Sequence, residues 1–204
     1  MKKLLTILFF CLLPIHLYPH NDVGTFTILA GGSIGEFLID AGGNFNDVYT
    51  NRQLAYTGIF GLGDGETFLI GKYRIFKATG QSKLQNIDAQ GKADWKQTIL
   101  GAGFRLHPQG SSFYFDALYL FTHAEETIGT ENPPVDFLAA SQKLDDNGFA
   151  FAFGLAPKLV SPIALDFEIE YSFMLRKPVN DNGRRVPNLG GLYYSAGISF
   201  YFNN

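Results

Sequence analysis

The segment that most constrains the fold is residues 192–202, which have the sequence LYYSAGISFYF. Every second residue in it is apolar, and the residues between are serine or glycine apart from a tyrosine near each end. Because successive side chains of a β-strand point to opposite faces, this pattern predicts a strand with one apolar face. A tilted strand needs roughly 9–11 residues to cross a bilayer, so this one is long enough. The apolar row is Leu192, Tyr194, Ala196, Ile198, Phe200 and Phe202.

Seven other segments show the same alternation and predict seven further strands. They are residues 35–45, 54–62, 67–79, 94–106, 112–125, 149–156 and 163–175. Residues 23–34 are also apolar and contain glycine. The pattern leaves open whether they extend the first strand, lie beneath a barrel or form a separate strand.

The connections between the predicted strands alternate in length. The short ones are tight turns at Asp64-Gly65, Pro108-Gln109-Gly110 and Ser161-Pro162, residue types that favour turns. The long ones are 47–53, 80–93, 126–147 and 178–188. This order predicts that the short turns lie on one rim and the long loops on the other.

The closing strand resembles the C-terminal signal of bacterial outer-membrane β-barrels, an alternating strand that ends in an aromatic residue. In that family the assembly machinery recognises this strand, which closes the barrel against the first. The resemblance implies that Tyr194, Ile198, Phe200 and Phe202 form the assembly signal, although Asn203 and Asn204 follow the aromatic residue here.

The strand number and the asymmetry of the connections resemble the small OmpA-like or OmpX-like eight-stranded barrels. The resemblance covers nearly all of the chain after residue 20. It implies an all-β protein, an eight-stranded antiparallel up-and-down transmembrane β-barrel, with both termini in the periplasm and the long loops outside the cell.

The composition agrees with an all-β domain. Of 204 residues, 15% are aromatic, 23 are glycine and only 17% are charged. A net charge of −3, with no run rich in lysine and arginine, argues against nucleic-acid binding. Cys11 is the only cysteine, so neither an intramolecular disulfide nor a cysteine-based zinc cluster can form.

The N-terminus has the pattern of an export signal. Lys2 and Lys3 precede the apolar run 4–13, which is too short to cross a membrane as a helix. We therefore predict a signal peptide at residues 1–20, a barrel domain at 21–204 and a location in the outer membrane. Leucine and phenylalanine precede Cys11 where a lipoprotein signal has small residues, so we interpret Cys11 as part of the signal peptide.

The charged residues within the predicted strands decide which face meets lipid. If they pointed outward, each basic one would cost roughly 2–4 kcal/mol at the membrane midplane. We therefore predict an interior cluster of paired charges that closes the barrel, with an ion-conducting path as the alternative. The predicted cluster is Glu36, Asp40, Lys72, Arg74, Arg105, Asp116, Asp166, Glu168 and Glu170.

Two other classes of function are alternatives for a chain of this kind, a soluble ligand-binding barrel and a lipid-modifying enzyme. A soluble lipocalin-like barrel that binds a small apolar ligand would carry a Gly-x-Trp motif near its start, but the only tryptophan is Trp95. Some lipid-modifying outer-membrane enzymes carry His-x-Ser on a strand, and this spacing is absent. We interpret His123 as a rim residue and predict no catalytic residues. The turn-like segments 145–148 and 180–183 lack the full spacing of a calcium loop, so we expect no metal and no cofactor.

The sequence therefore predicts a non-enzymatic outer-membrane barrel with a structural or surface-interaction role. Its expected partners are outer-membrane lipid, the barrel assembly machinery and a surface or envelope protein. Recognition is expected in the long loops, because loops on a rigid scaffold commonly carry it. The longest predicted loop, 126–147, is acidic with a small apolar patch, and its neighbour carries Arg184 and Arg185.

Overall fold

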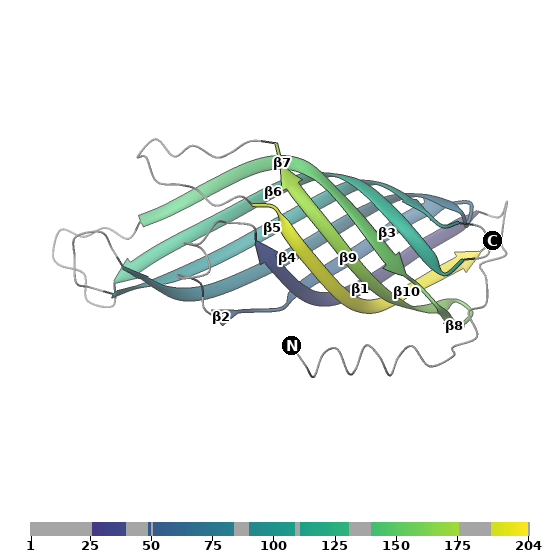
Figure 1. Cartoon of the computed structure of the whole chain (residues 1–204), viewed down its shortest axis with the longest axis horizontal. Helices are drawn as coiled ribbons and strands as arrows, with labels where there is room; N and C mark the ends of the chain where they lie inside the picture. The colour runs from purple at the N-terminus through teal and green to yellow at the C-terminus, as the bar shows by residue number, and fades with distance from the viewer. Residues whose placement is uncertain are drawn as a thin grey trace.

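Eight long strands form one closed antiparallel barrel in the computed structural model (Figure 1). The structure describes residues 26–39, 49, 51–83, 90–108, 111–130, 140–175 and 189–203. The predicted signal peptide and Asp40 lie outside the described residues. The long strands are β1 (Thr27–Ile39), β3 (Ala55–Gly63), β4 (Thr67–Lys83), β5 (Gln90–Leu106), β6 (Phe113–Thr130), β7 (Ala140–Leu155), β9 (Ile163–Met174) and β10 (Gly191–Asn203).

Each strand pairs with its neighbours in chain order, and β10 pairs with both β9 and β1, which closes the sheet. Two short segments, β2 (Asn51–Arg52) and β8 (Lys158–Val160), pair with β4 and β9. None of the described residues belongs to a helix long and apolar enough to cross a membrane. The predicted fold class, an all-β eight-stranded antiparallel barrel, is confirmed.

The first strand differs from its prediction. It starts at Thr27 and ends at Ile39, so the described part of the undecided segment 23–34 forms its first half. The interior position predicted for Glu36 is wrong, because Glu36 lies on the outer face while Phe37 and Ile39 are buried inside. Glycine and serine occupy much of this strand, so its alternation does not distinguish the two faces.

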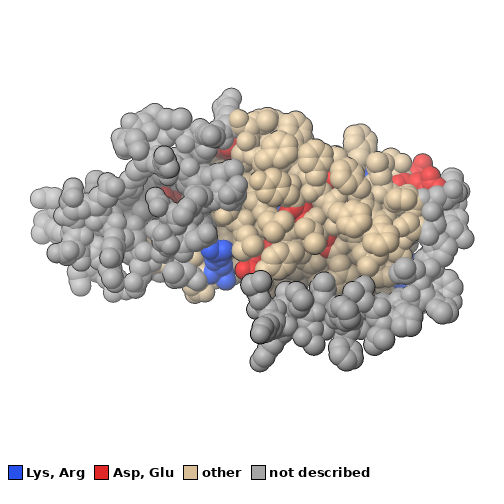
Figure 2. Space-filling model, in the orientation of Figure 1, with Lys and Arg blue, Asp and Glu red and all other residues tan. Residues whose placement is uncertain are grey.

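The outer wall of the barrel is apolar and its interior is charged. Figure 2 shows one face on which residues other than Lys, Arg, Asp and Glu cover most of the described surface. Large apolar side chains stand exposed on the outward rows, for example Leu69 at 60%, Phe104 at 56% and Ile169 at 59% exposure. This distribution reverses that of a water-soluble protein and suits hydrocarbon, so the barrel is of the transmembrane type.

The two ends of the barrel differ. The connections 64–66 and 156–162 lie at one end, together with 107–108, 111–112, Asn203 and its partner Thr27. At the opposite end β4, β5, β6 and β7, with 16 to 18 residues each, extend past β1, β3, β9 and β10, with 9 to 13 (Figure 1). We call residues 76–83, 90–97, 122–130 and 140–147 the projecting sheet and the rest of the eight strands the membrane barrel.

The projecting sheet corrects two predicted loops. Most of segment 126–147 is strand, because β6 continues to Thr130 and β7 starts at Ala140. Segment 80–93 is likewise mostly strand. In β6 and β7 the described side chains of 122–127 and 143–147 keep alternating, but the outward ones are polar, so the apolar row that predicts a strand is lost.

The hairpin between β3 and β4 forms as predicted from Asp64-Gly65. The Asp64 carboxylate accepts hydrogen bonds from the backbone N–H groups of Glu66 (3.1 Å) and Thr67 (2.7 Å), which lowers its pKa. Gly65 has a φ of 91°, which glycine adopts without strain. The turn joins two strands in register from Gly63↔Phe68 to Tyr56↔Ile75.

Candidate functional site

Seven charged side chains meet inside the membrane barrel. They come from inward rows of β4, β5, β6 and β9, and each is less than 10% exposed. We call this group the interior ion cluster: Lys72, Arg74, Arg105, Asp116, Asp166, Glu168 and Glu170. The structure brings all seven of these predicted residues together.

Arg105 joins three carboxylates. Its Nε and Nη2 atoms donate to the two carboxylate oxygens of Asp116 at 2.8 and 3.0 Å, a paired geometry that fixes both groups. Its other contacts are to Asp166 (3.5 Å) and Glu168 (3.3 Å). The guanidinium group also lies 3.5 Å from the ring centroid of Tyr114, a cation–π contact.

Lys72 also contacts three carboxylates, with its Nζ atom 2.7 Å from Asp116, 2.6 Å from Glu168 and 3.4 Å from Glu170. Asp116 and Glu168 are therefore shared between Lys72 and Arg105. Because Asp116, Glu168 and Glu170 each have two basic partners, the cluster behaves as a network rather than as separate pairs.

Arg74 lies at the end of the cluster nearer the projecting sheet. Its Nη1 donates to Glu170 at 2.8 Å and its Nε donates to the Thr57 hydroxyl at 3.1 Å. Its guanidinium group lies 3.6 Å from the ring centroid of Tyr193. The Thr57 hydroxyl in turn donates to the Tyr193 hydroxyl at 3.0 Å. These contacts hold the guanidinium group in one orientation.

Three polar residues that were not singled out from the sequence complete the cluster. The Tyr114 hydroxyl donates to Asp166 (2.5 Å) and contacts Glu168 (3.0 Å), and the Ser199 hydroxyl donates to Asp166 (2.5 Å). Thr57 is the third. All three lie on inward rows, but alternation alone does not show which inward side chains meet.

The interior ion cluster fills the barrel cross-section. Its three basic and four acidic side chains leave one negative charge in excess if all are ionised. The adjoining cavity has room for about one water molecule and is bordered by Ser195, whose hydroxyl has no hydrogen-bond partner among the described residues.

Two predicted cluster members are not in it. Glu36 lies on the outer face, where its carboxylate accepts a hydrogen bond from the Tyr194 hydroxyl of β10. Asp40 lies outside the described residues. Neither contributes to the pairing inside the barrel as described.

The residues predicted as the assembly signal form the outward row of β10. Ile198 is 46%, Phe200 36% and Phe202 49% exposed, and the rings of Phe200 and Phe202 stack with centroids 6.2 Å apart. Tyr194 continues this row on β10. They form part of the apolar wall.

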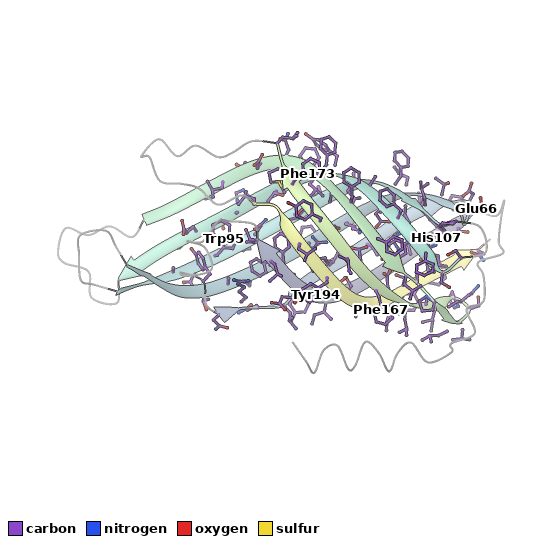
Figure 3. All side chains as sticks on the ribbon, viewed as in Figure 1. Glu66, Trp95, His107, Phe167, Phe173 and Tyr194 are labelled. Carbon is purple, nitrogen blue, oxygen red and sulfur yellow. The ribbon has the colours of Figure 1, made fainter. Side chains whose placement is uncertain are left out.

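The interior of the projecting sheet is mostly apolar, with a few polar side chains among the aromatic ones. Trp95 lies in this part of the molecule, while His107 lies toward the opposite end (Figure 3). Tyr49 packs against Trp95 with ring centroids 5.8 Å apart and donates to the Glu126 carboxylate at 2.5 Å. Gln97 donates to the backbone carbonyl of Leu189 at 2.7 Å. These contacts close the barrel at this end.

The outer face of the projecting sheet carries a charged group on β6 and β7. His123 contacts Asp145 through Nδ1 (2.6 Å) and Glu125 through Nε2 (3.5 Å), and Lys143 contacts Glu125 at 3.2 Å. The hydrogen bond with Asp145 raises the pKa of His123. Both ring nitrogens face carboxylates, so His123 is not arranged as a general base beside a nucleophile.

Among the described residues, no group of three or more histidine, cysteine, aspartate or glutamate side chains is arranged to hold a metal ion.

Comparisons with known proteins find a shared fold. No protein-family model matches the chain, and no curated protein sequence matches it. It is similar to two solved structures of Ail, the attachment invasion locus protein of Yersinia pestis. One, in complex with the heparin analogue sucrose octasulfate, has 10% identity and a TM-score of 0.51, covering 88% of this chain and 99% of that chain.

The second structure of Ail has 12% identity and a TM-score of 0.50, with the same coverage. Neisserial surface protein A has 10% identity and a TM-score of 0.45, covering 88% of this chain and 97% of that chain. At these identities the likeness to Ail shows the fold alone, a small barrel of the outer-membrane type.

Proposed function

We propose that this chain is a non-enzymatic integral protein of the bacterial outer membrane that binds a surface or envelope partner through its projecting sheet. The apolar outer wall and the ionic interior support the membrane placement, because hydrocarbon is the solvent that such a wall requires. Export by residues 1–20 and recognition of Tyr194, Ile198, Phe200 and Phe202 by the assembly machinery belong to the same proposal. The short turns then face the periplasm and the projecting sheet faces outward.

The structure does not favour the two alternative functions. A soluble barrel for an apolar ligand needs an apolar cavity, whereas this interior is packed with paired charges. A lipid-modifying enzyme needs an activated nucleophile, whereas both nitrogens of His123 face carboxylates. A binding role therefore remains the best supported.

The observation that carries the binding role is the edge of β7. From Gly148 to Leu155, β7 pairs with β6 on one side and β9 on the other. From Ala140 to Asp146 it pairs with β6, and no described strand lies on its other side. A row of unpaired backbone groups accepts an added strand, which is a common mode of peptide recognition.

The direction of the free backbone groups follows from the register. Asn147 accepts a hydrogen bond from Leu175 on the β9 side, so its backbone groups point away from β6. In an antiparallel pair, residues two apart point the same way. Lys143 and Asp145 therefore direct their backbone N–H groups to the free edge, while the residues between them bond to β6.

This geometry gives a direct test with purified protein in detergent and a displayed library of random peptides. Peptides enriched on the wild type are expected to bind K143P/D145P at least about tenfold more weakly, because proline removes the two free-edge N–H groups without removing a bond to β6. The control K143A/D145A loses the same side chains but keeps both N–H groups, and should bind nearly as well as the wild type.

Equal binding by K143P/D145P and the wild type would contradict the edge as the binding site. The membrane placement is tested separately by cell fractionation and by comparing gel mobility before and after heating. A soluble periplasmic protein whose mobility does not change on heating would contradict it.

A further inference from the structure

Two lysines face each other on the outer wall, at the boundary between the membrane barrel and the projecting sheet. Lys77 of β4 and Lys96 of β5 are directly opposite in the register, and both are exposed on outward rows. Side chains opposite each other in an antiparallel pair have Cβ atoms about 4.5–5.5 Å apart. Like charges at this separation repel, so the pair destabilises the sheet unless an anion lies between them.

Nearby acids do not neutralise these lysines. Glu125 is opposite Lys96 in the register, but its carboxylate contacts Lys143 (3.2 Å) and His123 (3.5 Å) instead. Asp94, on the same outward row as Lys96, also has an interaction of its own. Among the described lysine and arginine side chains, six have a partner, and Lys77 and Lys96 are the two that have none.

The position of the pair relative to the apolar wall indicates what kind of anion would reach it. Toward the membrane, the outward row continues with Ile75 and then Tyr73 on β4, Tyr73 being 48% exposed, and with Thr98 and then Leu100 on β5, Leu100 being 53% exposed. The lysines are therefore the first outward charges beyond the apolar wall on β4 and β5. Long lysine side chains at this level extend their ammonium groups among lipid headgroups.

We propose that Lys77 and Lys96 together bind the phosphate group of an anionic lipid in the leaflet next to the projecting sheet. The inference rests on the membrane placement proposed above, and it adds a specific lipid contact to it. Two ammonium groups can share the oxygens of one phosphate, which turns the repulsion between them into joint attraction. The acyl chains of the same lipid would lie against the wall near Tyr73 and Leu100.

The full chain in nonionic maltoside micelles allows a direct test with dioctanoyl phosphatidic acid as the probe. The lipid should raise the thermal unfolding midpoint of the wild type, followed by heat-dependent gel mobility. K77Q/K96Q should bind the lipid at least about tenfold more weakly and lose most of this rise, and each single variant should lose part of it. Without lipid at low salt, the double variant should unfold at a midpoint equal to or above the wild type's, because the repulsion is gone.

K158Q is the matched control, because Lys158 of β8 lies at the opposite end of the barrel and has an interaction of its own, so its replacement frees no acid beside Lys77 or Lys96. It should keep the full rise with phosphatidic acid. An equal rise for K77Q/K96Q would overturn the site. An equal rise of the wild type with dioctanoylglycerol would show that phosphate is not recognised, and one with inorganic phosphate would show that a lipid is not required; either result would overturn the proposal. A chain that fails to insert into micelles at all would instead contradict the membrane placement.

Discussion

The membrane barrel and the projecting sheet use the same strands with opposite chemistry. In the membrane barrel, Arg105 and Glu168 are buried inside while Phe104 stands on the outer wall. In the projecting sheet, Trp95 is buried inside while Lys96 stands on the outer wall. Four of these five residues, all except Glu168, lie on β5. The alternation of inward and outward side chains along β5 continues without a break between the two regions.

The difference shows that alternation and polarity carry separate information. Alternation follows from the strand itself, whereas the polarity of each face follows from the solvent on that face. On β6 the change occurs between Phe121, 54% exposed, and His123, the next outward residue. Below this level lipid is outside and charges are inside; above it water is outside and Ala124 and its neighbours form an apolar interior.

The interiors of the two regions should also lose stability differently when a residue is substituted. An apolar interior loses stability in proportion to the volume removed, because no unpaired charge is left behind. An ionic interior loses more when one partner is removed, because the remaining charges stay buried and uncompensated. The free energy of unfolding of the membrane barrel should therefore depend on whether a basic or an acidic side chain is removed.

The largest expected effect is the loss of Arg105. Arg105→Met leaves Asp116, Asp166 and Glu168 with one basic partner fewer and should lower the free energy of unfolding by about 3–5 kcal/mol. Glu168→Gln should cost less, because it leaves three basic and three acidic side chains, and Lys72 keeps Asp116 and Glu170. The measurement is the unfolding midpoint in detergent, and equal losses for the two variants would contradict the network described here.

An intermediate effect is expected from the same substitution on the two outer walls. Ala102 lies on the outward row of β5, midway between Leu106 and Thr98, so Ala102→Arg places a charge in hydrocarbon and should cost roughly 2–4 kcal/mol. Thr127→Arg, on the outer face of the projecting sheet, should change stability by less than about 0.5 kcal/mol. Reversible unfolding in the presence of lipid vesicles compares the two. Similar costs would mean that the boundary between lipid and water has been placed wrongly.

Much of the membrane barrel could be predicted because its period of two is unbroken. On β9 the apolar row from Ile163 to Phe173 fixes the other row, so the inward direction of Asp166, Glu168 and Glu170 follows from the sequence. The first strand could not be resolved in this way, since its glycines and Ser33 suit either face, and Glu36 was therefore placed on the wrong side.

The ends of the long strands were missed for a different physical reason. Where β6 and β7 leave the membrane, His123, Glu125 and Asp145 replace aromatic residues on the outward rows. The sequence then has no apolar row from which a strand could be predicted, and the segment has the composition of a polar loop. The partners within the interior ion cluster, such as Tyr114 with Asp166, depend on register and on barrel closure, which alternation does not contain.

The smallest expected effect concerns His123, on the outer face of the projecting sheet. Its hydrogen bond with Asp145 raises the pKa of His123 in the folded chain. The pKa of His123 is then higher in the folded chain than in the unfolded chain, where it is near 6.5. Its charged form therefore stabilises the fold fully below the unfolded pKa, and this stabilisation is lost as the pH rises through the folded pKa. Because the His123 side chain is 44% exposed, solvent screening limits its contribution to the free energy of unfolding to roughly a few tenths of a kcal/mol.

The test measures the unfolding midpoints of the wild type and of His123→Gln between about pH 6 and about pH 8. Other groups titrate in both proteins, so the difference between the two midpoints isolates the effect of His123. The advantage of the wild type should shrink as the pH rises, and added salt should reduce it at the lower pH. Asp145→Asn should remove most of this pH dependence while leaving the imidazole in place. A wild-type advantage that grew with pH would mean that His123 is held in its neutral form, and that the charged outer face of the projecting sheet is not as described.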